Sequence, residues 1–284
     1  METNLKESVE VVAANPDVFA ELVRAFEGAC PAQRIPESVI DILKDSGCLS
    51  GMSEQALLTE RGKALVYGLM ERNHLENGGA LDLFNEFEVD GRVVVDLGCG
   101  AGVYAREALR LGAEKVVALD VSPDMIAVAQ ALDTGTSCVY KLLEASKVIW
   151  PVEDCSADLV MARLVLPYVD PFWFFQQASR VLKPGGKLLL VVHSKDYYLG
   201  RLRDNLAWSH RRRLAQLSFA LFSGVAFRLF RIIPEVKIGG RKRCDCWYDR
   251  NNLVRLAARY SFTPDLINWP KSAPTPQLIF KLDK

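Results

Sequence analysis

The sequence has no excess of charge of either sign, no long hydrophobic run and no regular cysteine framework. Its 284 residues include 35 Lys and Arg against 35 Asp and Glu. The longest stretch without a charged residue or histidine, Leu214 to Phe227, is too short to cross a bilayer. The first residues lack the apolar core of a secretory signal, and seven irregularly spaced cysteines argue against a disulfide scaffold. These absences predict a soluble cytoplasmic protein.

Candidate ligands for a structural metal ion are also scarce. Hydrophobic residues, in contrast, are abundant enough to form a core. Cys244 and Cys246 form a C-x-C pair, but no second pair follows at ligand spacing, so we predict no metal site. Hydrophobic residues make up 50% of the chain and charged residues 25%, which is the composition of an ordinary globular protein. Intrinsic disorder is therefore excluded as the main state, and one large domain or two smaller ones are expected.

The pattern of apolar residues divides the chain into two predicted domains. Residues 1–80 predict a helical domain, because apolar side chains such as Val18, Leu22 and Phe26 recur at helical spacing. Residues 81–284 alternate strands and helices. Strands are expected at 92–97, 115–120, 158–161 and 187–193, with two closing strands at 266–269 and 277–280. Near-continuous apolar strands separated by helices predict a parallel sheet covered on both faces.

The second domain contains a basic insertion at about 195–243. It carries twelve Lys and Arg against three acidic residues. A helical stripe, broadened by phenylalanines, predicts that the insertion is a helical lid over a catalytic pocket. The stripe consists of Leu214, Leu217, Leu221, Val225 and Leu229. Contact with an anionic membrane surface, nucleic-acid binding and oligomer packing are the alternatives.

The most informative motif is a glycine-rich turn between a predicted strand and a predicted helix. It reads Val95-Asp96-Leu97-Gly98-Cys99-Gly100-Ala101-Gly102. Glycines allow the backbone to approach a ligand closely, and the start of the helix offers free N–H groups. Asp120 ends the next predicted strand, where a carboxylate can accept two hydrogen bonds from a ribose diol. This combination predicts a nucleoside-binding site.

The details of the turn limit which nucleoside can bind. The third glycine comes one residue too early for a dinucleotide fingerprint, and no Gly-Lys-Ser/Thr follows as in a phosphate-binding loop. Asp96 would repel a pyrophosphate but suits a ligand that carries positive charge. S-adenosylmethionine has an adenosine, a sulfonium and an ammonium, and therefore fits these requirements.

Three later segments accompany the glycine turn in the expected order. They are Ala118-Leu119-Asp120-Val121-Ser122-Pro123-Asp124-Met125, Pro151-Val152-Glu153-Asp154-Cys155-Ser156-Ala157-Asp158-Leu159-Val160 and Arg180-Val181-Leu182-Lys183-Pro184-Gly185-Gly186-Lys187-Leu188. With these segments, residues 88–194 resemble a class I S-adenosylmethionine-dependent methyltransferase. The resemblance implies a Rossmann-like α/β fold with a mostly parallel seven-stranded sheet. It also implies S-adenosyl-L-methionine as the methyl donor and S-adenosylhomocysteine as a product.

The resemblance assigns candidate cofactor-binding residues, with Asp96 beside the methionine end and Asp120 on the ribose. The set is Asp96, Gly98, Cys99, Gly100, Gly102, Tyr104, Asp120, Val121, Met125, Ser146 and Ala162. One departure concerns the adenine. Many relatives have an aspartate about five residues before the position of Pro151, whereas this chain has Ser146 there, with Glu144 two residues earlier.

Three residues are candidates for catalysis or for orienting the acceptor. His193 ends the predicted fifth strand and is the expected general base for a hydroxyl or carbon acid. Tyr168 and Arg163 follow the predicted fourth strand and could orient the substrate. Each also has a purely structural alternative, such as a histidine whose partners at the strand end are backbone groups.

The N-terminal segment resembles the winged-helix-like segment that precedes the catalytic domain in some small-molecule methyltransferases. The residues that carry this resemblance are 39–49 and 58–65. It implies a role in forming a homodimer or in roofing the substrate. DNA binding is disfavoured, because residues 1–80 contain 7 basic and 13 acidic side chains.

The predicted function is methylation of a small or amphiphilic metabolite at oxygen, nitrogen or carbon. Two alternatives remain open: an RNA methyltransferase, and a non-catalytic regulatory module that binds S-adenosylmethionine. Nucleic acid is not the expected partner, because no Asn-Pro-Pro-Tyr-type sequence follows the fourth strand, where residues 163–168 stand.

Overall fold

The computed structural model describes most of the chain from residue 88 onward. The described residues are 68, 84, 88–133, 135, 138–143, 149–205, 211–234, 236–238, 241–271 and 273–283. The predicted N-terminal domain lies outside the described residues except for Gly68, and so do Ser146 and Glu144. The chain forms two compact units. One contains Met1–Gly91 and Cys99–Lys147, and the other contains Arg92–Gly98 and Val148–Lys284.

The described part of the first unit is a pair of parallel strands with two helices. β2 (Lys115–Asp120) pairs with β3 (Cys138–Leu142), from Val116 opposite Cys138 to Asp120 opposite Leu142. The helices are α7 (Val103–Arg110) and α8 (Pro123–Leu132). Ser122 caps α8: its Oγ accepts the Met125 N–H, and Pro123 takes the first helical position.

Five strands of the second unit belong to the main sheet. β1 (Val93–Leu97), β4 (Ala157–Arg163) and β5 (Leu182–Val191) are parallel neighbours. β9 (Gln277–Leu282) pairs antiparallel with both β5 and β8 (Phe262–Asn268). The seven strands of the main sheet follow the order β3-β2-β1-β4-β5-β9-β8. The predicted seven-stranded, mostly parallel α/β sheet is therefore confirmed.

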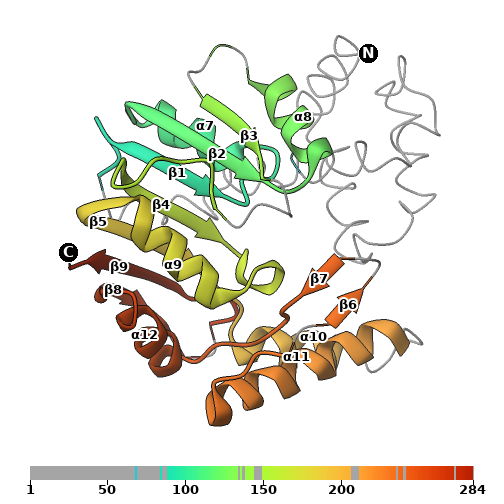
Figure 1. The fold of residues 1–284 in the computed structure, drawn as a ribbon. Helices are drawn as coiled ribbons and strands as arrows, with labels where there is room; N and C mark the ends of the chain where they lie inside the picture. Colours follow the sequence, from blue (N-terminus) through green and yellow to red (C-terminus); the bar gives the residue numbers. More distant parts are fainter. Residues whose placement is uncertain are drawn as a thin grey trace, which may run out of the picture. The chain divides into compact units, whose positions relative to one another are not determined.

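Aromatic side chains form much of the core of the second unit. Figure 1 shows α9 (Pro171–Val181) lying along β4 and β5. From α9, the ring of Phe175 contacts Phe262 of β8 at a centroid distance of 6.0 Å and Phe280 of β9 at 6.3 Å. All three rings are almost fully buried, so the helix holds strands together that are distant in sequence. The final helix, α12 (Arg250–Ala258), buries Leu253, Leu256 and Ala257.

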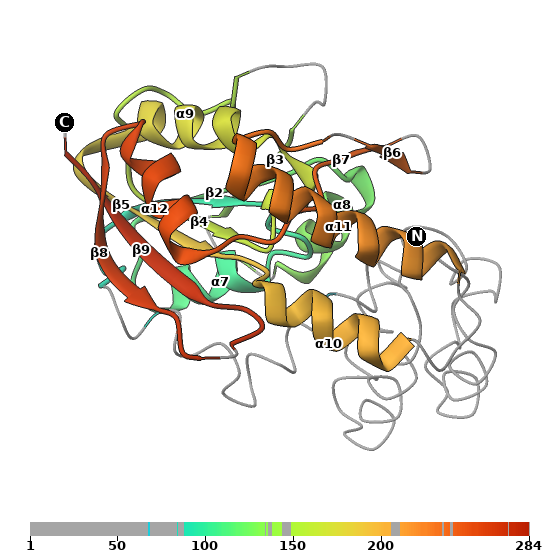
Figure 2. The same cartoon turned by 90° about the horizontal axis from the view of Figure 1, so that it is seen from below.

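The basic insertion of the second unit begins and ends at the same place beside the main sheet. Its helices are α10 (Lys195–Asn205) and α11 (Arg211–Phe230), and its hairpin joins β6 (Val236–Ile238) to β7 (Arg241–Arg243). Figures 1 and 2 show these elements gathered at one end of the unit. The chain returns where Tyr248 bridges Ser194 and donates its N–H to the His193 carbonyl at 3.4 Å. The predicted helices are present, but the end of the insertion is a hairpin that the helical prediction missed.

The stripe predicted for α11 is wrong in its second half. Leu217 is buried, but Val225 and Leu229 are 47% and 66% exposed. The buried face instead contains the small residues Ala220, Ser223 and Gly224. The reason is Trp247, whose indole lies so close to Gly224 that no side chain fits there, and whose Nε1 donates to the Leu221 carbonyl at 3.0 Å.

Two strand ends differ from the predictions and shift candidate residues. Ala162 and Arg163 lie within β4 rather than after it, because pairing with β5 continues as far as Arg163 opposite Val191. β5 ends at Val191, so His193 follows the strand instead of ending it. Arg163 and His193 nevertheless lie at, or just after, the carboxyl ends of their strands, where ligands bind in α/β sheets.

Candidate active site

The glycine turn has the backbone conformation that its sequence predicts. Gly98 and Gly100 have φ values of 71° and 53°, in the left-handed region that other residues rarely adopt. A side chain at Gly98 would also collide with Val165. Within the turn, Cys99 donates its N–H to the Leu119 carbonyl at 3.0 Å. This hydrogen bond connects Cys99 to β2.

Asp120 lies beside the turn, and its carboxylate is held by backbone donors. The N–H of Gly100 donates to Oδ2 at 2.9 Å, and the N–H of Ser122 donates to Oδ1 at 2.8 Å. The side chain is only half-buried. A carboxylate has about four acceptor positions, so this type of group suits hydrogen-bond donors from a ligand. Its orientation is set before any ligand binds.

The start of α8 extends this arrangement with apolar side chains. Val121, which follows Asp120, is 53% exposed, and Met125 in the first turn of α8 is half-buried. Since the Ser122 cap fixes the start of the helix, both residues lie a short distance along the chain from the carboxylate. The first unit therefore brings together Gly100, Asp120 and Ser122 through hydrogen bonds.

The glycine turn also contacts a tyrosine and an arginine that were not predicted. A side chain at Gly102 would meet Tyr140 of β3 and Arg106 of α7. Arg106 donates to the Ala101 carbonyl at 2.8 Å and to the Tyr140 hydroxyl at 3.4 Å. Burial raises the pKa of Tyr140 well above its ordinary value, so the hydroxyl stays protonated. The candidate Tyr104 is buried in α7.

The second unit contains the other candidates at the ends of β1 and β4. Asp96 is 4% exposed and lies opposite Met161, while Leu97 lies opposite Ala162. Beyond β4 the backbone is strained: Leu164 has a φ of 57°, held by donation of its N–H to the Val191 carbonyl at 2.9 Å. Such strain, at the end of a parallel strand, is typical of functional sites.

Tyr168 and His193 differ in their surroundings. Tyr168 lies in a 3-10 turn (Leu166–Tyr168) and is 57% exposed, so it is accessible to a ligand. His193 is half-buried, and its ring stacks on Tyr197 of α10 at a centroid distance of 3.7 Å. The edge of Tyr198 faces the same imidazole at 5.8 Å. Aromatic rings from the insertion therefore surround one side of the candidate base.

The returning end of the insertion touches the turn after β4. Cys244 donates its N–H to the Pro167 carbonyl at 2.9 Å. Next to it, Asp245 is 2% exposed and accepts a hydrogen bond from the Gln216 amide of α11 at 3.3 Å. The insertion is thus connected both to the region of His193 and to the turn that carries Tyr168. Sequence reasoning missed these contacts, because nothing in the Cys-Asp-Cys motif indicates what it packs against.

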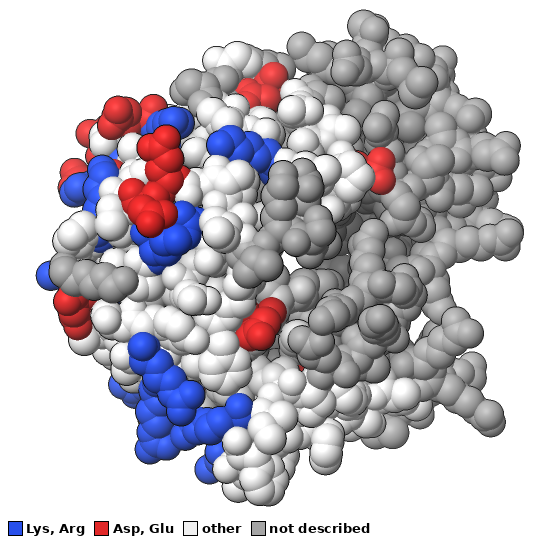
Figure 3. Space-filling model, in the orientation of Figure 1, with Lys and Arg blue, Asp and Glu red and all other residues white. Residues whose placement is uncertain are grey.

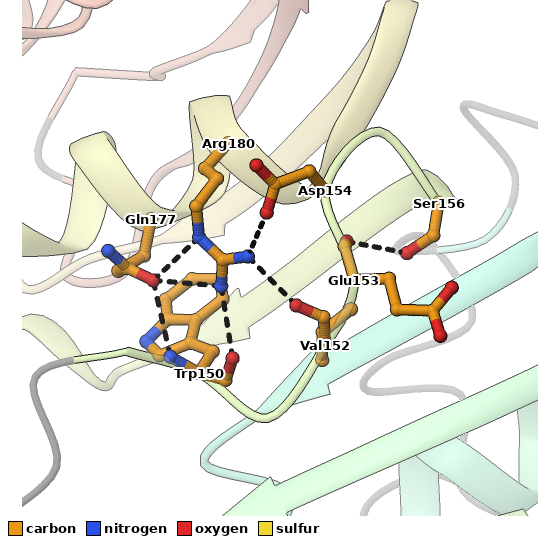
Figure 4. Close-up of polar contacts among 7 residues, drawn as sticks. All are labelled: Trp150, Val152, Glu153, Asp154, Ser156, Gln177 and Arg180. Atoms are coloured by element: carbon orange, nitrogen blue, oxygen red, sulfur yellow. Dashed lines mark hydrogen bonds and ion pairs between the residues drawn. The ribbon is translucent and has the colours of Figure 1, made fainter.

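Two of the segments quoted for the resemblance are joined by hydrogen bonds. Arg180 donates to the carbonyl oxygens of Trp150 at 3.0 Å and Val152 at 2.9 Å, and it pairs with Asp154 (Figure 4). Gln177 Oε1 accepts from Arg180 Nε at 3.1 Å and from the Trp150 N–H at 3.2 Å. The arginine therefore fixes the loop that leads into β4, which places it in a structural role rather than in the candidate site.

A second contact joins the same motifs. Lys183 Nζ lies 2.9 Å from both carboxylate oxygens of Asp158, and Val93 of β1 donates its N–H to Oδ2 at 2.9 Å. Burial raises the pKa of Asp158, but the hydrogen bonds from Lys183 and Val93 outweigh it, so the net pKa is below its ordinary value. These bonds connect β1, β4 and β5 at the strand ends opposite the candidate site.

Comparisons with known proteins agree with this architecture. Residues 95–190 match the family model described as a methyltransferase domain. An uncharacterized methyltransferase of Mycobacterium tuberculosis is 36% identical over 113 residues, which cover 40% of this chain and 44% of the relative. A ubiquinone biosynthesis O-methyltransferase of Xanthomonas euvesicatoria is 35% identical over 112 residues, covering 36% of this chain and 44% of the relative. The matched region thus spans less than half the length of either relative.

Solved structures show the same fold. An S-adenosylmethionine-dependent methyltransferase of Mesorhizobium loti superposes with a TM-score of 0.50 and 20% sequence identity, covering 70% of this chain and 95% of that one. Residues 95–190 are therefore similar to a methyltransferase domain, and the chain shares its fold with a solved S-adenosylmethionine-dependent methyltransferase. This confirms the resemblance drawn from the sequence for that part of the chain.

Proposed function

We propose that the protein is an S-adenosylmethionine-dependent methyltransferase that acts on a small or amphiphilic metabolite. The observation that carries the proposal is the half-buried Asp120 carboxylate, oriented by the N–H groups of Gly100 and Ser122. It lies within the segment that matches the methyltransferase-domain family. The names of the relatives and of the structural neighbour support both the reaction and the cofactor.

The residues of the first unit suit the nucleoside end of the cofactor. A carboxylate such as Asp120 can accept hydrogen bonds from the hydroxyls of a ribose diol, and the glycine backbone presents no side chains to the ligand. Val121 and Met125 offer apolar surface that suits the adenine. The contributions of Asp96, Tyr104 and Ser146 stay predictions from the resemblance.

The bound cofactor supplies a methyl group on a positively charged sulfur, so the protein need not provide an electrophile. Its own residues position the acceptor and, for a hydroxyl acceptor, remove a proton. We assign proton removal to the imidazole of His193, which the stack with Tyr197 holds in place. Arg163 and the exposed Tyr168 are proposed to orient the acceptor.

We assign binding of the methyl acceptor to the insertion. Its aromatic residues Tyr197 and Tyr198 lie against His193, and its returning strand contacts the turn after β4. These contacts support a lid that encloses an acceptor with an apolar or aromatic part. The relative named ubiquinone biosynthesis O-methyltransferase supports oxygen as the methylated atom. The N-terminal segment, residues 1–80, is proposed to roof the acceptor or to form a homodimer.

Calorimetric titration tests the cofactor assignment. S-adenosylmethionine and S-adenosylhomocysteine should bind at micromolar to millimolar concentration, whereas NADH and ATP should not. Saturation by NADH or ATP without a response to S-adenosylmethionine would contradict the proposal. Binding without turnover on any small phenol, amine or carbon acid would favour a regulatory module, and salt-sensitive retention on RNA would favour an RNA substrate.

A deletion tests the lid. Because Ser194 and Tyr248 are bridged, residues 195–243 can be replaced by a short linker without separating the strands. The shortened protein should still bind the cofactor but should lose acceptor methylation. Persistent methylation would remove the insertion from the acceptor site.

A further inference from the structure

The end of α11 exposes an unusual number of large apolar side chains. Of the eleven large hydrophobic residues that are exposed in the described part of the chain, five lie between residues 222 and 232. They are Phe222 at 63%, Val225 at 47%, Leu229 at 66%, Phe230 at 69% and Ile232 at 61%. We name these five side chains the apolar face. The opposite side of the helix packs on Trp247, so the apolar face contributes nothing to the core.

Exposed arginines lie next to the apolar face. Arg228 is on α11 itself, and Arg250, Arg255 and Arg259 are exposed on or directly after α12. The two helices are neighbours at this point, because Arg231 Nη1 donates to Asn252 Oδ1 of α12 at 2.6 Å. Figure 3 shows the Lys and Arg side chains gathered over α12 and the adjoining end of α11, beside an uncharged surface.

Acidic side chains do not balance these arginines. Among the described residues from 218 to 262, the two acids are Asp245, which is buried, and Asp249, which caps α12 by accepting the Asn252 N–H at 2.8 Å. Within the described part of the chain, none of the arginines Arg228, Arg250, Arg255 and Arg259 forms an ion pair. The surface is therefore apolar in one part and rich in arginine in the adjoining part.

We propose that the apolar face and its four arginines dock the protein on the surface of an anionic phospholipid bilayer. Apolar side chains of a surface helix enter the boundary between headgroups and acyl chains, and arginines bind the phosphates. A second copy of the chain is a poorer occupant, because a symmetric contact would bring like charges together. Among the described residues no helix could span a bilayer, so the contact is an interfacial one.

Membrane docking is a property beyond the proposed methyl transfer, and it would place that reaction at the surface of a bilayer. The same insertion that encloses the proposed acceptor site would rest on the bilayer, where an amphiphilic acceptor is concentrated. Docking does not require bound cofactor, so the two proposals can fail independently.

Vesicle sedimentation of the full chain tests the proposal. The protein should sediment with vesicles of phosphatidylcholine mixed with phosphatidylglycerol and remain in solution with phosphatidylcholine alone. Leu229→Asp with Phe230→Asp should weaken the partition about tenfold or more, and Arg255→Gln with Arg259→Gln should weaken it at low salt by a similar factor. Ile149→Asp is the matched control, because Ile149 is 59% exposed in another part of the chain and should have no effect.

Several outcomes would overturn the proposal. These are equal binding to neutral vesicles, no binding to anionic vesicles, and retention by the Leu229→Asp, Phe230→Asp variant. A dimer that this variant dissociates, without vesicle binding by the parent protein, would assign the face to a second copy instead. Thermal melting and cofactor titration of each variant separate loss of docking from loss of folding.

Discussion

The Gly100 N–H donates to Asp120 Oδ2 at 2.9 Å, so the glycine turn and the end of β2 form one hydrogen-bonded structure. Two features that are separated in sequence thereby combine into a group that is ready to bind a diol. The nucleoside site that we propose depends on this pair more than on either residue alone.

Replacing the carboxylate should weaken cofactor binding without unfolding the protein. Asp120→Ala removes acceptors for the ribose hydroxyls, and we expect a loss of about 1.5–3 kcal/mol in the free energy of S-adenosylmethionine binding, measured by calorimetry. Asp133→Ala, at the end of α8, is the control and should bind normally. An unchanged affinity in Asp120→Ala would exclude the ribose assignment.

Removing the imidazole of His193 should slow turnover. If the ring accepts a proton from a hydroxyl acceptor, His193→Ala should lower kcat by about 100-fold or more and remove the acidic limb of the pH–rate profile. His193→Gln should not restore the rate, since an amide is no base. Rates close to normal in both variants would make the histidine a packing partner of Tyr197 alone.

Alanine at two helical glycines should have opposite effects on stability. At Gly200 of α10 an added Cβ meets no atom within 4 Å, so Gly200→Ala should stabilise the protein by about 0.5–1 kcal/mol through helix propensity. At Gly224 the added Cβ would overlap the Trp247 indole, so Gly224→Ala should destabilise it. Thermal denaturation measures both, and equal shifts would contradict the packing of α11 on Trp247.

Neutralising Asp158 should lower stability in a pH-dependent way. Asp158→Asn removes the ion pair with the 41% exposed Lys183, and we expect a loss of roughly 0.5–1.5 kcal/mol in the free energy of unfolding at neutral pH. Because the folded-state pKa of Asp158 is lowered, its stabilisation is present above the unfolded pKa of about 3.9 and disappears as the pH falls through the folded value.

The measurement is urea unfolding of both proteins from neutral pH down to below pH 4. The difference between them should be largest at neutral pH and should close at the acidic end. Asp154→Asn is the control, because its carboxylate is 72% exposed and contributes less. A difference that grows as the pH falls would have the wrong sign.

The sequence predicted the elements whose pattern reflects complete burial. β2 was predicted with its observed bounds and β1 to within a residue, because their apolar runs face covered sides of the sheet. β3 was missed, since its burial does not follow its hydrophobicity: Leu142 is exposed whereas Tyr140 and Lys141 are half-buried. The β6–β7 hairpin was missed because Arg241-Lys242-Arg243 carries no strand signal.

The sequence predicted those parts of the candidate site that local motifs encode. The sequence predicted that the turn and Asp120 each follow the end of a strand, but it did not predict the hydrogen bond between Gly100 and Asp120. The Tyr140 contact and the link from Cys244 to Pro167 depend on long-range packing that no local motif encodes. The same is true of α11, where Trp247, some twenty residues away, decides which face is buried.

The bridge between Ser194 and Tyr248 means that the insertion departs and returns at a single point. Segments attached in this way can be lengthened, shortened or exchanged while the strands beneath keep their order. Under the proposed function, exchange of this segment would alter acceptor preference, in evolution or by grafting, and leave the proposed cofactor site on the other strand ends unchanged.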